Sequence, residues 1–179
     1  MALFRPHLIF NRITDIPIDY LINMGIKGVA LDADNTLSTH HSQIPLDGVT
    51  DWLAAARENG IKVMIVSNAR ARRIVPFAQT LGLSYISLAC KPLPIGFIRA
   101  ARAMGVRCGE VAAIGDQLFT DVMGARLAGV KPLLVTPIKV EDGASFRLRR
   151  RLERPLIEKY ERIGLHFDLQ SDLGGHHVS

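Results

Sequence analysis

The feature that most constrains the fold of this chain is a regular alternation of short apolar runs with longer segments of helical periodicity. The predicted strands cover residues 26–33, 62–67, 85–89, 111–115 and 132–135, and the predicted helices cover 46–59, 70–81, 92–104 and a segment that ends at Gly129. Parallel strands need crossover connections of this kind. The pattern therefore predicts an α/β fold, doubly wound around a mainly parallel, Rossmann-like sheet.

Length and composition favour one globular domain. The chain has 179 residues, of which 48% are hydrophobic and 22% are charged, which suits one buried core and is too little for two. We predict a single domain over residues 1–179, with its sheet core at about 26–137 and a basic helical segment at about 145–164.

The sequence gives no signal of membrane insertion or export. No apolar stretch approaches the roughly 18 residues that cross a bilayer, and polar residues interrupt the amino-terminal segment. The apolar groups Leu3-Phe4 and Leu8-Ile9-Phe10 are predicted to form either an arm over the sheet or a lipid-contacting edge. We expect a soluble, cytoplasmic protein, with contact at the inner face of the membrane as an option. Cys90 and Cys108 are expected to be buried thiols.

Polar side chains follow each of the first four predicted strands. Asp32 and Asp34 follow the first strand, Ser67 and Asn68 the second, Lys91 the third, and Asp116 and Asp121 the fourth. Because the carboxyl ends of parallel strands meet at one edge of a sheet, these side chains are expected to gather there. Singly, each has an ordinary reading, such as a strand-end cap for Ser67 or an early-helix acid for Asp121. Together they fit phosphoryl transfer through an aspartyl-phosphate.

These segments, in this order, resemble the four motifs of haloacid dehalogenase-type phosphatases. They are Asp32-Ala33-Asp34-Asn35-Thr36, Ser67-Asn68, Lys91-Pro92 and Gly115-Asp116-Gln117-Leu118-Phe119-Thr120-Asp121. More narrowly, the chain resembles the YqeG-like subgroup of class IIIA, which is similar to mitochondrial phosphatidylglycerophosphate phosphatases. It departs from the usual pattern at Ala33, where a bulkier apolar residue is common, and at Ala69, where asparagine is common. Neither departure removes a catalytic group.

The resemblance implies a role for each motif residue. Asp32 would be the nucleophile, and Asp34 would protonate the leaving alkoxide and then take a proton from water. Ser67 and Asn68 would bind the phosphate, and Lys91 would offset its negative charge. Because a phosphate dianion repels an attacking carboxylate, a cation is needed between them, and Mg²⁺ suits oxygen ligands. By resemblance its ligands would be the Asp32 carboxylate, the Asp34 main-chain carbonyl and the Asp116 carboxylate, with Asp121 as a further ligand or anchor.

The spacing of the motifs leaves no room for a lid domain. Between Thr36 and Ser67, and again between Asn68 and Lys91, the chain holds only a loop, one predicted helix and one predicted strand. We therefore expect a capless enzyme whose cleft is open to a large or membrane-resident phosphate ester.

The basic segment near the carboxyl terminus has more than one reading. Residues 147–162 carry seven Arg or Lys against three Glu, and Leu148, Leu152, Leu156 and Tyr160 recur every four residues. Such a helix either packs its apolar stripe on the sheet while its arginines stay solvated, or lies on an anionic membrane surface. Nucleic acid is a third potential partner, but no aromatic or motif signature supports it.

The sequence thus favours magnesium-dependent hydrolysis of a phosphomonoester through an aspartyl-phosphate. Phosphatidylglycerophosphate is the favoured substrate by resemblance. The alternative within enzymes is a phosphatase for a soluble metabolite or a phosphoprotein. The alternative of another class is a magnesium-holding module that binds RNA or a ribosomal partner without significant turnover. The oligomeric state is not predicted.

Overall fold

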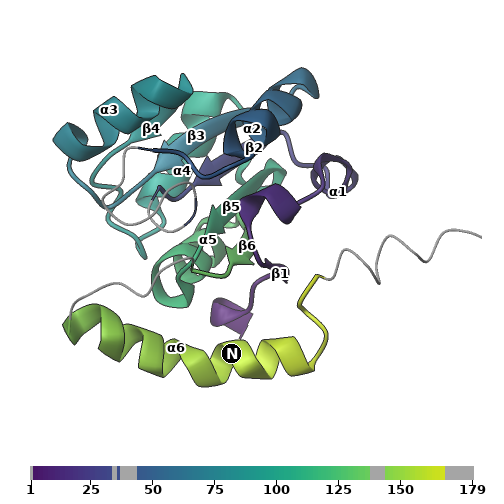
Figure 1. Cartoon of the computed structure of the whole chain (residues 1–179), viewed down its shortest axis with the longest axis vertical. Coiled ribbons are helices and arrows are strands. Elements are labelled where there is room, and N and C mark those ends of the chain that lie inside the picture. Colours follow the sequence, from purple (N-terminus) through teal and green to yellow (C-terminus); the bar gives the residue numbers. More distant parts are fainter. Residues whose placement is uncertain (1, 34–35, 37–43, 138–143, 168–179) are drawn as a thin grey trace, which may run out of the picture.

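The computed structural model describes residues 2–33, 36, 44–137 and 144–167, and in this part of the chain six strands form one parallel sheet. The strands are β1 (Leu8–Phe10), β2 (Gly28–Leu31), β3 (Lys62–Val66), β4 (Ser84–Ile86), β5 (Val111–Gly115) and β6 (Lys131–Val135). Their order across the sheet is β1-β6-β5-β2-β3-β4, and every pair is parallel (Figure 1). The predicted α/β fold with a parallel sheet is confirmed.

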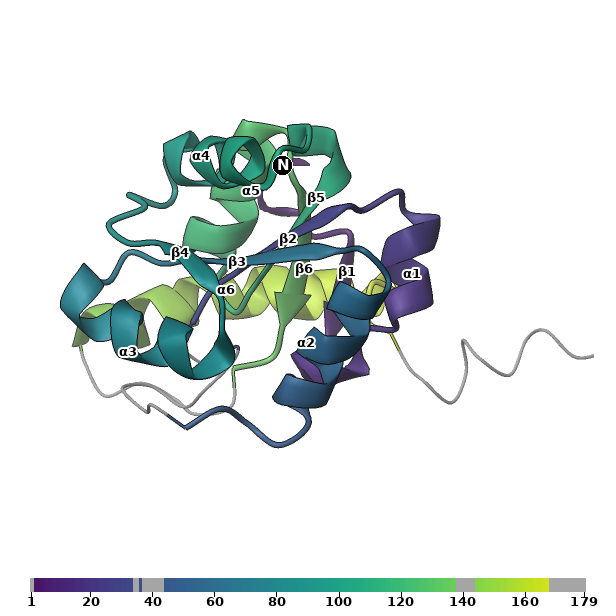
Figure 2. The same ribbon diagram turned by 90° about the horizontal axis from the view of Figure 1, so that it is seen from above.

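Helices cover both faces of this sheet. They are α1 (Ile18–Asn23), α2 (Val49–Glu58), α3 (Ala71–Leu81), α4 (Ile95–Met104), α5 (Met123–Ala128) and α6 (Ala144–Arg162). Short helical turns are η1 (Ala2–Phe4), η2 (Ile13–Asp15), η3 (Cys108–Glu110) and η4 (Leu118–Val122), the last of which is a π-helical turn. Figure 2 shows α4 and α5 on one face of the sheet and α2 and α3 on the other. This is the doubly wound arrangement that the alternating pattern predicts.

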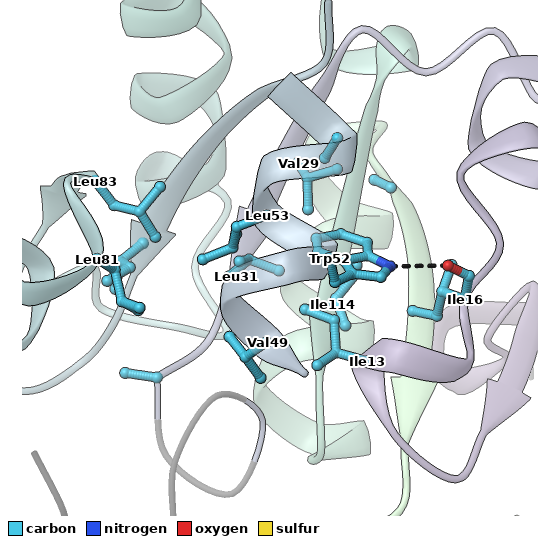
Figure 3. Close-up of a cluster of buried hydrophobic side chains, with 14 of the residues drawn as sticks. Ile13, Ile16, Val29, Leu31, Val49, Trp52, Leu53, Leu81, Leu83 and Ile114 are labelled. Atoms are coloured by element: carbon cyan, nitrogen blue, oxygen red, sulfur yellow. Dashed lines mark hydrogen bonds between the residues drawn. The ribbon is translucent and has the colours of Figure 1, made fainter. Parts of the chain in front are cut away.

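The largest core cluster fixes the central strands beneath α2. Val49, Trp52 and Leu53, which share one face of α2, are buried against the apolar side chains of β2 and β5 (Figure 3). The Trp52 indole Nε1 donates a hydrogen bond of 2.8 Å to the carbonyl of Ile16, so its polar atom is satisfied within the core. This packing holds the carboxyl end of β2, where Asp32 follows, against a rigid support.

Two ends of the sheet differ from the sequence prediction. The segment predicted as a strand over 85–89 is β4 over 84–86, because Leu88 and Cys90 have φ of 48° and 57° and leave the extended conformation. At the opposite edge, Leu8–Phe10 is a sheet strand paired with β6, and Ile9 and Phe10 are buried. Leu8–Phe10 is therefore a strand of the sheet rather than an arm over it, and the burial of Ile9 and Phe10 contradicts a lipid-contacting edge.

The apolar stripe of α6 divides into two halves. Leu156 and Tyr160 pack against Ile9, Leu118 and other residues of a small core cluster, whereas Leu148 and Leu152 are 60% and 55% exposed. Packing of the apolar stripe on the core is thus confirmed for Leu156 and Tyr160 and not for Leu148 and Leu152. Among the described helices, none has the length and apolar character needed to cross a bilayer.

Candidate active site

Four of the side chains that follow the strands come together in one buried cluster. Asp32 lies directly after β2, Lys91 after β4, Asp116 after β5, and Asp121 in η4. All four residues are less than 9% exposed. Carboxylate oxygens of Asp32, Asp116 and Asp121 lie within 4.8 Å of one another. The expectation that the carboxyl ends of the strands assemble these groups is therefore met.

Lys91 forms ion pairs with two of the three carboxylates. Its Nζ lies 2.6 Å from Oδ1 of Asp32 and 2.6 Å from Oδ1 of Asp121. Burial alone would lower the pKa of Lys91, but the charges of Asp121 and Asp32 and their hydrogen bonds raise it above its ordinary value. Lys91 is thus a fixed positive charge between the two acids rather than a solvated surface lysine.

Ser67 and Asn68 join the segments after β3 and β4 into one unit. The Asn68 amide donates to the carbonyl of Lys91 at 2.9 Å and accepts the Lys91 backbone N–H at 2.7 Å. The buried Ser67 hydroxyl accepts the backbone N–H of Ala69 at 3.1 Å, which leaves its own proton available for donation. Asn68 therefore positions Lys91, and its direct contact with phosphate stays a prediction.

The turn between Gly115 and Asp121 depends on close packing. The second Asp121 oxygen, Oδ2, accepts the backbone N–H of Gln117 at 3.2 Å. A Cβ atom built on Gly115 would lie 2.4 Å from the Asp121 Cγ, so only glycine fits this position. Asp121 is 3% exposed, and the simple early-helix reading does not describe it. It belongs to the acidic cluster.

An arginine from α6 also enters the cluster, which the sequence analysis did not foresee. Arg150 forms an ion pair with Oδ2 of Asp116 and donates a second hydrogen bond to the Asp116 carbonyl. It also pairs with Glu153 at 3.2 Å, and Glu153 is fully buried and accepts the backbone N–H of Phe119 at 3.0 Å. The expectation that the arginines of this helix stay solvated is wrong for Arg150. One residue in the sequence could have indicated this contact. Glu153 is an acid three residues from Arg150, and the structure places it on the inner side of the helix.

The remaining Asp116 oxygen marks where a cation fits. Burial raises the pKa of Asp116 well above its usual range, an effect that Arg150 opposes and that Asp32 and Asp121 reinforce. Within the described residues, Oδ1 of Asp116 is buried without a hydrogen-bond partner. A cluster of three carboxylates that offers such an oxygen suits a hard divalent cation. The residues present therefore fit a metal site, which their chemistry favours over a purely structural ion-pair network.

Some predicted residues lie elsewhere or outside the described chain. Asp34 and Asn35 lie outside the described residues. Cys90 is exposed and Cys108 partly exposed, so the expectation of two buried thiols is wrong. Cys90 stands in the left-handed region between Ala89 and Lys91, which turns its side chain outward from a sequence position that reads as apolar.

Comparisons with known proteins identify the family. Residues 38–129 match the family model described as haloacid dehalogenase-like hydrolase. "Probable phosphatase YqeG" of Bacillus subtilis is 35% identical over 161 residues, which cover 90% of this chain and 94% of that protein. The chain belongs to the haloacid dehalogenase-like hydrolases. Within that family it is a phosphatase of the YqeG-like type.

Two further relatives of this hydrolase carry more specific names. Residues 1–73 match the model described as mitochondrial PGP phosphatase. Phosphatidylglycerophosphate phosphatase 1, chloroplastic/mitochondrial, of Arabidopsis thaliana is 26% identical over 89% of this chain, which spans 49% of that relative's length. A phosphoglycolate phosphatase of Thiobacillus denitrificans is 32% identical over 58% of this chain and 48% of its own length.

Solved structures agree on the hydrolase fold. A HAD family hydrolase from Deinococcus radiodurans, with bound phosphate and sodium, has a TM-score of 0.56 at 16% identity and covers 73% of this chain and 96% of its own. D,D-heptose 1,7-bisphosphate phosphatase from B. bronchiseptica, complexed with magnesium and phosphate, has a TM-score of 0.52 at 22% identity and covers 61% and 80%. At these identities the likeness shows the fold alone.

Proposed function

We propose that this phosphatase hydrolyses phosphatidylglycerophosphate, with magnesium, through an aspartyl-phosphate on Asp32. The observation that carries the proposal is the buried contact of Asp32 with Lys91 beside Asp116 and Asp121. A carboxylate in such a place has both a neighbouring cation and a metal-type acid cluster to offset the charge of a phosphate ester.

The proposed reaction proceeds in two displacements. In the first, an Asp32 carboxylate oxygen bonds to phosphorus while the bond from phosphorus to the ester oxygen breaks. Asp34 gives its proton to the departing alkoxide. In the second, water loses a proton to Asp34 and attacks the same phosphorus, which releases phosphate and restores the Asp32 carboxylate. Lys91 stays protonated throughout, because two acids raise its pKa.

Asp32, Asp116 and Asp121 would hold the divalent ion. When bound, magnesium would supply the positive charge that lets a carboxylate approach a phosphate dianion. Arg150 already neutralises one Asp116 oxygen, and among the described residues the other oxygen has no hydrogen-bond partner. The protein's own part is therefore to present pre-oriented oxygens, which lowers the reorganisation needed in the transition state.

Two observations support a lipid phosphate as the substrate. The amino-terminal part of the chain matches the mitochondrial PGP phosphatase model, and a named phosphatidylglycerophosphate phosphatase is a relative. In the described residues, the stretches in which a lid would stand hold only α2 and β3, or α3 and β4. An open site suits a headgroup that remains attached to a membrane. We also propose a cytoplasmic, peripheral location for the protein.

The second candidate substrate is a soluble metabolite, which the named phosphoglycolate phosphatase relative favours. The deciding experiment compares kcat/KM on phosphatidylglycerophosphate in mixed micelles with kcat/KM on phosphoglycolate. We expect the lipid to be preferred at least tenfold. A preference of a hundredfold for phosphoglycolate would reject the lipid substrate and leave the phosphatase chemistry standing.

The covalent step has its own test. Rapid quenching of a single turnover with ³²P-labelled substrate should trap label on the wild-type protein and none on the Asp32→Asn variant. Asp19→Asn, an exposed acid of α1, is the matched control and should trap label normally. Label on the Asp32→Asn variant equal to wild type would reject Asp32 as the nucleophile.

A further inference from the structure

We propose that the surface around Lys91 docks on an anionic phospholipid bilayer; this rests on the proposed lipid substrate. The rim surface is defined here as the exposed side chains of Leu88, Leu93, Ile95, Arg70 and Arg72. They come from the segment between β4 and α4, from the first residue of α4 and from the residues that open α3. Three are large aliphatic groups and two are cations.

The aliphatic side chains of the rim surface face solvent although their sequence neighbour is buried. Leu88, Leu93 and Ile95 are 57%, 54% and 55% exposed, whereas Lys91 between them is 7% exposed. The segment thus turns its charged side chain inward and its apolar side chains outward. Exposed apolar groups gathered in one short segment mark an interaction site more often than leucines scattered singly over a surface do.

The backbone fixes this orientation. Leu88 has φ of 48°, a left-handed conformation that is unfavourable for a residue with a branched side chain. It is held there by hydrogen bonds from Leu88 N–H to the Ala69 carbonyl at 3.0 Å and from Ala89 N–H to the Ser67 carbonyl at 3.0 Å. Since backbone groups hold the segment, the exposed Leu88 side chain is not needed to stabilise it.

The sequence segment that carries the rim surface contains positive charges and no acid. Residues 59–109 contain no Asp or Glu and eight Lys or Arg, namely Lys62, Arg70, Arg72, Arg73, Lys91, Arg99, Arg102 and Arg107. Arg70 follows Ala69, whose carbonyl accepts the Leu88 N–H, so the backbone of one cation of the rim surface lies close to that of Leu88. Aliphatic groups beside arginines complement the apolar interior and anionic headgroups of a bilayer.

The place of the rim surface suits a substrate that stays in the membrane. Asp32, Ser67 and Lys91 follow β2, β3 and β4, so the site and the rim surface share the carboxyl edge of the sheet. Both views place the start of α3, the β4–α4 connection and the amino-terminal half of α6 on one side of the molecule, although Figure 1 shows α3 and α6 apart along its long axis (Figures 1 and 2). A headgroup phosphate could therefore reach Asp32 while its acyl chains stay in the bilayer.

The test is co-sedimentation of the full chain with vesicles of phosphatidylglycerol and phosphatidylcholine, without substrate. The variant L88N/L93Q/I95Q removes the aliphatic groups, and asparagine at 88 tolerates the left-handed backbone. We expect binding to fall about tenfold or more, because insertion of apolar side chains contributes in proportion to the area buried. The matched control is I22Q/L127Q/I163Q, three aliphatic residues of 43%, 48% and 54% exposure in other segments of the chain, which should bind like wild type.

A second variant tests the charge of the rim surface. R70Q/R72Q should weaken vesicle binding at low salt and much less at high salt, since screening removes the contribution of these arginines in wild type. Hydrolysis of para-nitrophenyl phosphate by each variant verifies that it is folded. If L88N/L93Q/I95Q binds vesicles as wild type does, or if the control loses as much, the rim surface is not the docking site.

Single-stranded RNA serves as the competing probe. Binding of RNA by wild type that is tighter than vesicle binding, and unchanged in L88N/L93Q/I95Q, would overturn the bilayer assignment. These measurements contain no phosphatidylglycerophosphate. A wrong lipid substrate would therefore be detected only in the micelle kinetics. A wrong docking surface would be detected in the sedimentation experiment.

Discussion

Two basic regions of this chain differ in what their charges contact. In α6, Arg150 pairs with Asp116 and Glu153, and Arg154 pairs with Glu158. Residues 59–109, in contrast, contain no acid, and Lys91 there pairs only with acids from elsewhere in the sequence. From its cations and its apolar stripe, the sequence of α6 predicted either packing on the sheet or contact with a membrane. The comparison teaches that the carboxylates available nearby, rather than the number of cations, decide whether a basic segment faces inward or outward.

The largest expected effect concerns the acids that both regions neutralise. Chelation by EDTA should abolish phosphatase activity, because three clustered carboxylates cannot otherwise accommodate a phosphate dianion. Added Mg²⁺ should restore activity, and Ca²⁺ should restore it poorly, since its larger and looser coordination misplaces the attacking oxygen. Steady-state kinetics across metal concentrations measure this. Full turnover in a chelated preparation would contradict the metal assignment.

The next prediction compares Lys91, which pairs with buried acids, with a solvent-exposed cation of the same acid-free segment, residues 59–109. Lys91→Met should lower kcat by about 10²- to 10³-fold, the scale for loss of one charge that stabilises a transition state. The control Arg99→Gln alters an exposed cation of α4 in the same segment and should leave kcat within twofold. A comparable loss of kcat in the two variants would show that the pairing of Lys91 with Asp32 and Asp121 does not contribute to catalysis.

A smaller effect is expected from the inward cation of α6. Arg150→Gln should raise the Mg²⁺ concentration for half-maximal activity about tenfold, because Asp116 loses a partner that orients it. The control Arg151→Gln changes an exposed neighbour on the same helix. Mn²⁺ binding in the absence of substrate, measured by electron paramagnetic resonance, should show the same tenfold loss of metal affinity.

Arg150→Gln should also lower the free energy of unfolding by about 1–3 kcal/mol, since Glu153 is left buried with one partner fewer. A double-mutant cycle with Glu153→Gln should give a smaller loss than the two single losses together. Unchanged metal affinity and unchanged stability in Arg150→Gln would show that the contact is incidental.

The smallest effect tests the exposed half of α6. Arg147 and Arg151 are exposed next to Leu148 and Leu152 in the amino-terminal half of α6. R147Q/R151Q should weaken vesicle binding at low salt by a few fold, less than the loss of the aliphatic rim, because arginines at the margin of the contact should contribute less than the roughly 1 kcal/mol that each gives when it lies on an anionic surface. A loss larger than that of L88N/L93Q/I95Q would return the principal membrane contact to α6.

The sequence by itself determined the alternation of β2 to β6 with helices and the edge of the sheet at which the chemistry gathers. Apolar runs, helical periodicity and glycine stops are local signals, and the polar groups after β2, β3, β4 and β5 needed only the rule that parallel strands end at one edge. Asp32, Lys91, Asp116 and Asp121 were found this way. Each of these inferences depends on residues that are close to one another in the sequence.

Tertiary structure alone decided which distant residues complete and surround that edge. Leu8–Phe10 joins the sheet beside β6, and Arg150 reaches Asp116 from a helix whose composition predicts a solvated or lipid-facing surface. Leu88 faces outward because the backbone takes a left-handed conformation that no residue type there announces. Such contacts depend on packing between segments far apart in sequence, where the desolvation of a charge or the fit of a backbone outweighs local preference.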